Sequence, residues 1–380
     1  MKAVTADEPQ FLLSFSPQSG IIDTPHHHHS GDRSMRRSIL PAAFFLFSFA
    51  LLPTLRAQQT PDYKSNPKFQ SAMTDAKQLQ KERQILFAIE AYKKANKIAD
   101  GKDSDCLKAL LDLQMKSASF KDAAATAASL EALAVTPAEK SKAKSERGYA
   151  LYLQSADKKH DLLIEADAEF KAALADNPKN ATALYLDGHV LAVLGQMEAA
   201  RAQFKACVSC ISPSDPSYLR AQHFAEDPSL SLHKMAPAFT VTALDGTRIN
   251  LDAMGGRVVL IDFWATWCGP CNRELPHMKK IAKEFAGQPL VIISVSWDSD
   301  EAKWKDFINK NEMTWVQYRD ADHALSKSFG IDAIPHYFTI DSDGVLTSEM
   351  LGEDSDVEGK LKKLVAKAKA ASAPASQVGN

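Results

Sequence analysis

The sequence predicts a multidomain protein, in which an all-α N-terminal solenoid of helical hairpins is followed by a C-terminal α/β domain. Residues 68–225 are rich in Ala, Leu, Lys and Glu, and their apolar residues recur every three or four positions, as in packed helices. Residues 235–370 instead alternate β-branched stretches with helical ones, which is typical of an α/β sandwich. A chain of 380 residues is long enough for both domains.

The composition narrows the class of protein. Apolar residues make up 45% and charged residues 24%, as in soluble globular proteins. The net charge of −2 argues against nucleic acid or an anionic membrane as the main partner. Five cysteines are too few for a disulfide scaffold, but four of them lie in two Cys-x-x-Cys pairs, which indicates a more specific role.

Residues 35–57 have the layout of a secretory signal peptide. Arg36 and Arg37 form a basic start, residues 39–52 are apolar, and a small-residue cleavage site ends at Ala57. An uncleaved membrane anchor is the alternative, although the apolar run is broken by prolines and short for a span of about 20 residues. We therefore expect an exported, periplasmic protein, soluble after signal cleavage or membrane-anchored without it, in an oxidising compartment.

The segments around this signal are expected to carry no function. Residues 1–34, with four histidines at 26–29, are interpreted as a disordered non-native or mispredicted extension upstream of Met35. Residues 58–67 are polar and contain two prolines, so they are predicted to be a linker.

A repeat of 34 residues marks the helical domain. Three positions recur at this spacing, namely Ala166, Phe170 and Ala173 as Ala200, Phe204 and Cys207. This is the period of the tetratricopeptide repeat, a helix-turn-helix unit, and residues 168–207 closely resemble that family.

The resemblance implies three to four stacked hairpins and a protein ligand for the repeats, with an irregular helical bundle as the alternative. It also implies that Gly188 allows two helices to approach, that Gly195 makes a turn, and that Ala200 fills a small slot.

The elements of the α/β domain follow in order after a linker at 226–234. A hairpin with an Asp245–Gly246 turn leads into a buried strand at 258–263. A helix then opens at Cys268. The remaining predicted elements are a strand at 290–298, helices at 300–311 and 323–329, a strand at 336–341, a short strand after Asp343–Gly344, a helix at 356–370 and a disordered tail at 371–380.

The pair Cys268 and Cys271 carries the clearest chemical signal. A Cys-x-x-Cys directly after a buried strand, at the opening of a helix, is typical of a redox site. Free N–H groups and the helix dipole stabilise a thiolate there, so the pKa of Cys268 should lie below that of free cysteine. Cys268 would attack a disulfide and Cys271 would resolve the mixed disulfide. Pro270 falls in the first turn, where its missing N–H costs nothing.

The segment IDFWATWCGPC at 261–271 resembles the thioredoxin active site almost residue for residue. APAFTVTALDGTRINL before it, Glu-Leu-Pro after it and the signal-like segment are similar to the exported TlpA/ResA-like thiol–disulfide oxidoreductases. The resemblance covers roughly residues 235–365. It implies a thioredoxin fold and an enzyme that reduces client disulfides through a redox-active disulfide, Cys268–Cys271, with no other cofactor.

The same resemblance implies two proton-exchanging acids. Asp262 matches the buried carboxylate that serves the resolving cysteine, and Glu274 matches an acid that does related work from the other side. A buried carboxylate with a raised pKa is a suitable acceptor for a thiol proton. The alternatives are a purely structural acid at Asp262 and a solvated helix residue at Glu274.

Further positions are assigned to substrate binding. Ile334 and Pro335 match the cis-proline loop, which packs beside the sulfurs and offers backbone groups to the client. Trp267, Gly269 and Pro270 border the pair. Trp264 and Trp267 either cover the disulfide or are ordinary packing residues. His336, after the proline, either contacts substrate or is a solvated histidine at a strand start, and we favour the solvated histidine.

The remaining cysteines and histidines are not expected to bind metal, because none shows zinc-ligand spacing. Cys207 and Cys210 form a disulfide or, as we favour, are free thiols. The expected partners are client proteins with disulfides, such as apocytochrome c, and a membrane thiol carrier as electron donor. The alternatives are a repeat scaffold with a redox-passive module and a peroxiredoxin. A peroxiredoxin fits poorly, because Thr266 lies two residues before Cys268 rather than three.

Overall fold

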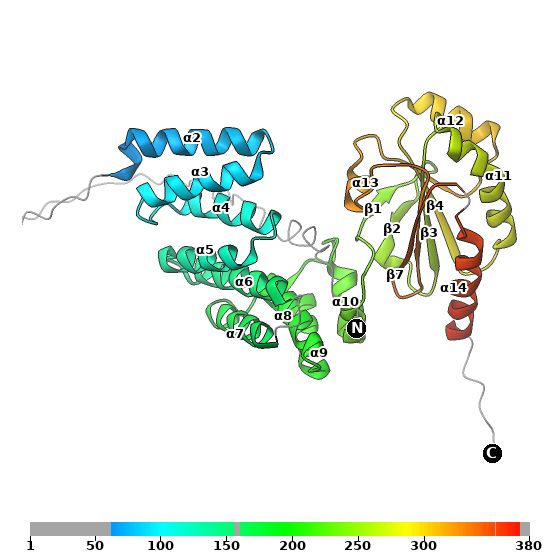
Figure 1. Ribbon diagram of the computed structural model, residues 1–380. Coiled ribbons are helices and arrows are strands. Elements are labelled where there is room, and N and C mark those ends of the chain that lie inside the picture. Colours follow the sequence, from blue (N-terminus) through cyan, green and yellow to red (C-terminus); the bar gives the residue numbers. More distant parts are fainter. Residues whose placement is uncertain (1–61, 156–159, 354, 373–380) are drawn as a thin grey trace, which may run out of the picture.

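The structure is a computed structural model that describes residues 62–155, 160–353 and 355–372. The predicted extension at 1–34 and signal peptide at 35–57 lie outside these residues. Within the described residues, no helix combines the length and the apolar character that crossing a membrane requires. The predicted order of a helical domain followed by an α/β domain is confirmed (Figure 1).

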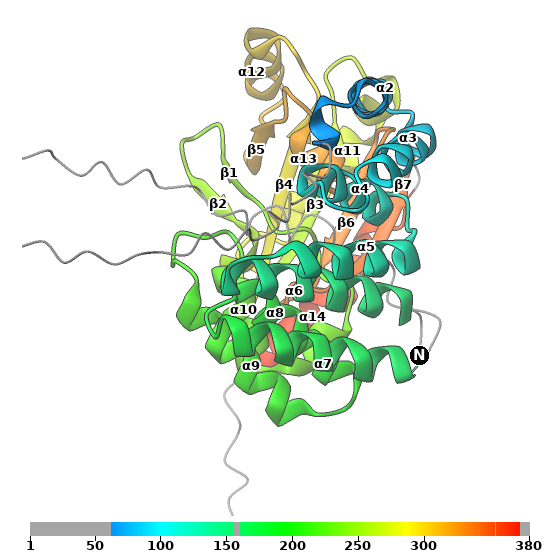
Figure 2. The ribbon, with the colours of Figure 1, turned by 90° about the vertical axis from the view of Figure 1, so that its left-hand side faces the viewer.

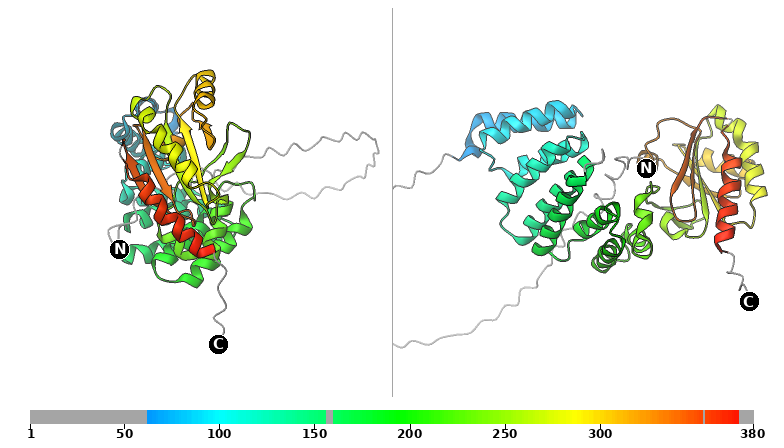
Figure 3. Two further views of the ribbon diagram at one scale, coloured as in Figure 1. Left: turned by 90° about the vertical axis from the view of Figure 1, so that its right-hand side faces the viewer. Right: turned by 60° about the horizontal axis from the view of Figure 1, so that its bottom comes forward.

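The helical domain is a stack of antiparallel helix pairs. Figure 2 and Figure 3 show these helices lying side by side. Neighbouring helices pair as α2 with α3, α4 with α5, α6 with α7, and α8 with α9. Their bounds are α2 Pro67–Lys81, α3 Ile85–Ile98, α4 Ser104–Lys116, α5 Phe120–Leu133, α6 Pro137–Gln154, α7 His160–Asp176, α8 Ala181–Val193 and α9 Met197–Cys210.

Side-chain caps explain where several of these helices begin. Asp103 accepts a 2.7 Å hydrogen bond from the N–H of Cys106, and Thr136 and Glu139 form a capping box. Two turns that the sequence does not signal lie between α2 and α3 and between α4 and α5. Arg83 and Ala118 adopt left-handed backbone conformations there, with φ of 60° and 55°, in the place where a glycine is usual.

Glycines allow two of the helix pairs to pack closely. A Cβ on Gly188 of α8 would lie 2.7 Å from the ring of Phe204 in α9. In the preceding pair, a Cβ on Gly148 would lie 2.9 Å from the ring of Phe170. This repeated glycine–phenylalanine contact is consistent with structural repeats. The 3-10 turn η1 (Tyr63–Ser65), in the predicted linker, packs on the first pair, because the rings of Tyr63 and Phe69 meet edge to face at 5.1 Å.

The junction between the domains is packed and polar. Helix α10 (Tyr218–Glu226) and the 3-10 helix η3 (Pro228–Leu232) end the helical domain, and η3, within the predicted linker, packs on α8 and α9. Arg220 of α10 is buried and donates hydrogen bonds to Oδ1 of Asp252 at 2.6 and 3.0 Å and to the carbonyl of Ala236 at 2.7 Å. The buried guanidinium thus joins the two domains through Oδ1 of Asp252 and a backbone carbonyl, whereas Oδ2 of Asp252 is buried without a hydrogen-bond partner among the described residues.

The α/β domain is built on a five-stranded sheet of order β5-β4-β3-β6-β7, preceded by a hairpin of β1 and β2. Strands β4 and β5 run parallel to β3, whereas β6 is antiparallel to β3, and β7 is antiparallel to β6. The strands are β1 Thr240–Thr242, β2 Arg248–Asn250, β3 Val258–Trp264, β4 Leu290–Ser296, β5 Val316–Arg319, β6 His336–Ile340 and β7 Leu346–Leu351. The sequence did not predict β5.

Helices cover both faces of this sheet (Figure 1). They are α11 Gly269–Glu284, α12 Glu301–Lys310, α13 Ala324–Ser328 and α14 Val357–Ser372, and a 3-10 turn η4 (Leu251–Ala253) follows β2. Alternate residues of β3 face opposite layers. Val259 and Ile261 pack with the hairpin and α13, whereas Val258 and Leu260 pack with α11 and α14. Asp262 has the parity of the second group and therefore faces the layer of α11.

Candidate active site

Cys268 and Cys271 form a disulfide at the start of α11. Their sulfurs are 1.98 Å apart and their Cα atoms 5.3 Å apart. Cys268 is the N-cap of the helix, and the backbone N–H of Cys271 donates a 3.2 Å hydrogen bond to its sulfur. The sequence predicted that this sulfur lies at the N-terminus of the helix. It contacts one of the N–H groups that the first turn of a helix leaves without an intrahelical partner.

The cis-proline loop lies beside this disulfide. The Ile334–Pro335 peptide bond is cis, the isomer that the resemblance implies, and the carbonyl oxygen of Ile334 is 3.9 Å from the sulfur of Cys268. The carbonyl of Pro335 accepts a 2.9 Å hydrogen bond from the N–H of Gly352, just after β7. The loop thus joins the disulfide to the end of the outer strand.

The residues next to the disulfide differ in their exposure to solvent. Cys268 is only 5% exposed, whereas Trp267 directly before it is 64% exposed. Gly269 is exposed as well, and Pro270 is partly buried. Trp264 differs from Trp267, because it is buried and its ring packs 5.5 Å from that of Phe307 in α12. Trp267 therefore faces the outside of the site, and Trp264 belongs to the packing beneath it.

Asp262 is buried and lines the same cavity as the resolving cysteine. Tyr337 lines this small cavity as well, which has room for about one water molecule. The pKa of Asp262 is raised to about 7, mainly by burial; a hydrogen bond from Ser294 lowers it and the charge of Glu274 raises it, and both effects are included in that value. The acid can thus bind and release a proton near neutral pH.

A hydrogen-bonded chain holds Asp262 from the neighbouring strand. The hydroxyl of Ser294 in β4 donates to Oδ2 of Asp262 at 2.8 Å, and the indole N–H of Trp315 donates to that hydroxyl at 2.8 Å. Ser294 lies directly opposite Asp262 in the parallel register. Sequence reasoning missed both residues, because only this register places them beside the acid.

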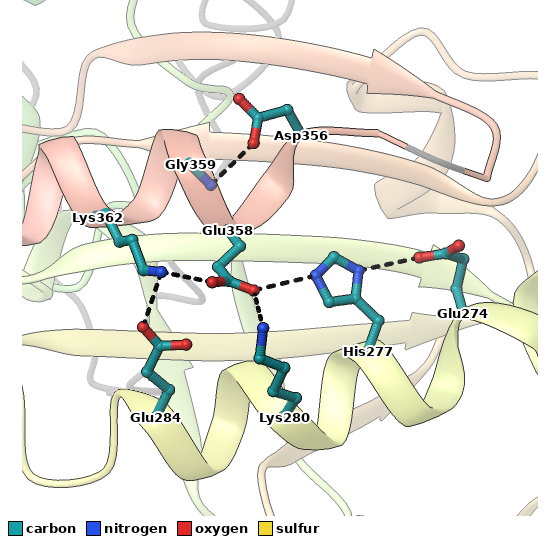
Figure 4. A network of polar contacts seen from close by, with 8 residues as sticks. All are labelled: Glu274, His277, Lys280, Glu284, Asp356, Glu358, Gly359 and Lys362. Carbon is teal, nitrogen blue, oxygen red and sulfur yellow. Dashed lines mark hydrogen bonds and ion pairs between the residues drawn. The ribbon is translucent and has the colours of Figure 1, made fainter.

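Glu274 lies one turn after Cys271 on the partly buried side of α11. Its side chain is 15% exposed, and Oε2 is 3.2 Å from Nδ1 of His277. The alternative of a solvated Glu274 is therefore wrong, and the reason is the packing of α14 against this face of α11. His277 links Glu274 to Glu358 of α14 (Figure 4).

The favoured expectation for His336 is wrong, because this residue is buried rather than solvated. It is 7% exposed, its ring stacks on Phe338 at 4.9 Å, and Nε2 is 3.1 Å from Oε1 of Glu349. It pairs with Leu351 of β7, so the outer strand covers a position that would otherwise face solvent. The sequence pattern does not show how β7 is aligned with β6.

A second acid fixes the turn before Cys268. Asp298 accepts hydrogen bonds from the N–H and the hydroxyl of Thr266, at 2.9 and 2.6 Å, and from Ser296 at 2.7 Å. Asn272 of α11 donates at 2.9 Å to the carbonyl of Thr266. The turn is thus held from the sheet and from the helix, and sequence reasoning did not identify Asp298 or Asn272.

The second cysteine pair has a different environment. Cys207 and Cys210 are free thiols at the end of α9, and burial raises the pKa of Cys207 to about 12. Cys106 is free and buried as well. Within the described residues, no group of three or more His, Cys, Asp or Glu side chains could hold a metal ion.

Comparisons with known proteins match the α/β domain. A family model described as Redoxin matches residues 232–365. The thiol-disulfide oxidoreductase ResA of Bacillus anthracis is 32% identical over 143 residues, which is 37% of this chain and 83% of the relative. ResA of Bacillus subtilis (strain 168) is 28% identical over 129 residues, 34% of this chain and 72% of the relative.

Solved structures are similar as well. The thioredoxin domain of a thiol-disulfide oxidoreductase from Bacteroides vulgatus is 30% identical, and the match covers 35% of this chain and 96% of that one, with a TM-score of 0.32.

A helix-capping disulfide beside a cis-proline, on a thioredoxin-like sheet, defines the class of thiol–disulfide oxidoreductases. The chain belongs to the ResA family of these enzymes.

Proposed function

We propose that this enzyme is an exported reductase of client protein disulfides, with Cys268 as the attacking thiol and Cys271 as the resolving thiol. The single observation that carries the proposal is the position of Cys268, whose sulfur caps α11 and lies 3.9 Å from the carbonyl of Ile334. A sulfur in that position has a thiolate-stabilising N–H on one side and the cis-proline loop on the other.

The reaction balances in two exchange steps. The Cys268 thiolate attacks one sulfur of the client disulfide, and the other client sulfur leaves as a thiolate and takes up a proton. Cys271 then loses its proton to Asp262 and attacks the sulfur of Cys268, which releases the second client sulfur as a thiolate that takes up a proton. Two electrons pass to the client, and the Cys268–Cys271 disulfide remains.

The rim of the site supports a protein client. The exposed ring of Trp267 and the neighbouring Gly269 and Pro270 offer a contact surface for a chain that enters along Ile334 and Pro335. The chemistry requires a dithiol donor that reduces the enzyme again, and a membrane thiol carrier would supply it in an exported setting. Apocytochrome c cysteines before haem attachment are one client class that fits the resemblance.

An insulin-reduction assay with dithiothreitol as donor tests this function. We expect thiol-dependent turnover by the wild-type protein and its loss in Cys268→Ser. Cys210→Ser is the matched control, because it removes a thiol of the other Cys-x-x-Cys pair, at a helix C-terminus, and should leave turnover unchanged. Absence of wild-type turnover would favour the alternative of a repeat scaffold with a redox-passive module.

The direction of electron flow has its own test, the reduction potential of the Cys268–Cys271 couple. A value near the roughly −270 mV of thioredoxin supports a reductase, and one near roughly −120 mV would indicate an oxidant.

We further propose that the helical pairs are tetratricopeptide repeats that recruit a protein partner. The glycine–phenylalanine contacts at Gly148 and Gly188 support a repeated unit. Crosslinking and mass spectrometry on a client complex trapped by Cys271→Ser should place crosslinks on α2–α9. Crosslinks confined to the α/β domain would contradict recruitment by the repeats.

A further inference from the structure

His277 of α11 takes part in no step of the proposed reaction. Its imidazole lies between two carboxylates, one on α11 and one on α14. Nδ1 of His277 is 3.2 Å from Oε2 of Glu274, and Nε2 is 3.6 Å from Oε2 of Glu358 in α14 (Figure 4). The side chain of His277 is 32% exposed, whereas that of Glu274 is 15% exposed. The imidazole therefore stands between the partly buried acid and solvent.

The charges around this imidazole leave room for one more proton. Glu358 pairs with Lys280 at 2.8 Å and with Lys362 at 2.5 Å, and Lys362 also reaches Glu284 at 3.2 Å. Hydrogen bonds from the two lysines lower the pKa of Glu358 to about 2. Three carboxylates and two ammonium groups leave one negative charge in the network, which a protonated imidazole would neutralise.

Two other charged groups near the imidazole have partners of their own among the described residues. Arg273, one turn earlier on α11, pairs with Glu353 at 2.7 Å, and Asp356 caps the start of α14 through the N–H of Gly359. Their charges are thus engaged elsewhere, and Glu274 and Glu358 are the carboxylates in contact with His277.

On its inner side, Glu274 is coupled to the cavity beside Cys271. Its charge raises the pKa of Asp262, where burial is the larger cause, and it acts in the same direction on Tyr337. Asp262 and Tyr337 both line the cavity that Cys271 also lines. The charge of Glu274 therefore acts on groups beside Cys271, while its carboxylate contacts the imidazole at the surface.

We propose that His277 is a positioning residue of the exchange reaction, which holds the Glu274 carboxylate and passes protons between that carboxylate and solvent. The inference rests on the proposed function. When Cys271 loses its proton to Asp262, a proton moves on to the Glu274 carboxylate, Glu274 hands it to Nδ1 of the neutral imidazole, and Nε2 releases one to water. The two sulfur electrons follow the exchange already described, so atoms and charges balance.

The test compares His277→Asn with Lys280→Gln in the full-length protein. Lys280 lies on the same helix and contacts Glu358 but not Glu274, so its substitution is a matched control for loosening the α11–α14 contact. Without the imidazole, the Glu274 carboxylate loses the contact through which it exchanges protons with solvent. We expect the acid limb of the pH–rate profile for insulin reduction to move up by about one pH unit, a tenfold loss of rate at fixed pH on that limb. Lys280→Gln removes one positive charge from the network but keeps the imidazole, so it should move the acid limb much less than His277→Asn does.

A second measurement uses the wild-type protein and therefore does not depend on whether a variant folds. Heteronuclear NMR of the wild-type imidazoles, in the oxidised and the dithiothreitol-reduced protein, should show that His277 titrates with different midpoints in the two states. Identical midpoints, or a His277→Asn profile that overlays that of Lys280→Gln, would overturn the proposal and leave His277 as a contact between helices. If the wild-type protein reduces no insulin, the proposed function fails, but the two titrations still decide whether His277 senses the cysteine pair.

Discussion

Ser294 and Asp262 lie opposite each other on neighbouring parallel strands, and the serine hydroxyl donates a 2.8 Å hydrogen bond to Oδ2 of the carboxylate. Because Trp315 donates to the same hydroxyl, the dipoles of both groups point toward the acid. This chain opposes the burial that raises the pKa of Asp262 to about 7. It keeps the acid ionisable near neutral pH, where a proton acceptor for a thiol is needed.

Replacing Ser294 by Ala should therefore raise the pKa of Asp262 further. A hydrogen bond to a charged group contributes about 1.5–3 kcal/mol, which corresponds to one or two pH units. Infrared difference spectroscopy of the carboxyl band across a pH titration would measure the shift. Ser296→Ala is the matched control, since Ser296 bonds to Asp298 instead. Equal titrations in the two variants would show that Ser294 does not tune the acid.

Asp262→Asn should stabilise the protein at alkaline pH and have little effect in acid. Since the folded-state pKa is raised above the unfolded value of about 3.9, the wild-type carboxyl favours folding fully only below about pH 4. That contribution is lost as the pH rises to 7. We expect a gain on the order of 3 kcal/mol at pH 8, from urea unfolding of the oxidised proteins. An equal gain in unfolding free energy at pH 4 would contradict this account, because the gain should come only from the charged form of the buried carboxyl.

Cys271→Ser should accumulate a mixed disulfide between Cys268 and a client. The sulfur of Cys268 can still attack, but no second thiol lies within bonding distance to release the product. Non-reducing electrophoresis and mass spectrometry after incubation with oxidised insulin would detect the adduct. Cys268→Ser should give no adduct, and trapping through Cys271 in that variant would reverse the assigned roles.

Gly188→Ala should destabilise the helical domain although alanine is the better helix former. Its Cβ would lie 2.7 Å from the ring of Phe204, and such overpacking costs about 1–3 kcal/mol, more than the roughly 1 kcal/mol gained in helix propensity. Phe204→Leu in the same chain should recover part of the loss. Thermal unfolding followed by circular dichroism checks both, and an unchanged Gly188→Ala would refute the close approach.

The sequence predicts the parts of this fold that depend on local patterns. A β-branched run predicts the buried strand before Cys268. The spacing of the two cysteines predicts the helix that begins there. The 34-residue period likewise places Phe170 and Phe204 in equivalent buried positions. Each of these signals lies within one helix or strand, or in the next one along the chain, so it can be recognised from the sequence alone.

The missed features depend on contacts between distant segments. Strand β5 is only four residues long and lies at a sheet edge, where apolar alternation is weak. His336 is buried by its pairing with β7, and Ser294 meets Asp262 only through the parallel register. The link from Glu274 through His277 to Glu358 requires α14 to lie against α11. None of these contacts can be recognised from the spacing of residues within one stretch of sequence.

The central claim is that the sulfur of Cys268 is held as a thiolate at the start of α11. Ultraviolet titration of the reduced protein at 240 nm, with Cys268→Ser as the blank, measures it directly. We predict an ionisation midpoint well below the roughly 8.5 of free cysteine. A midpoint at or above that value would contradict the account.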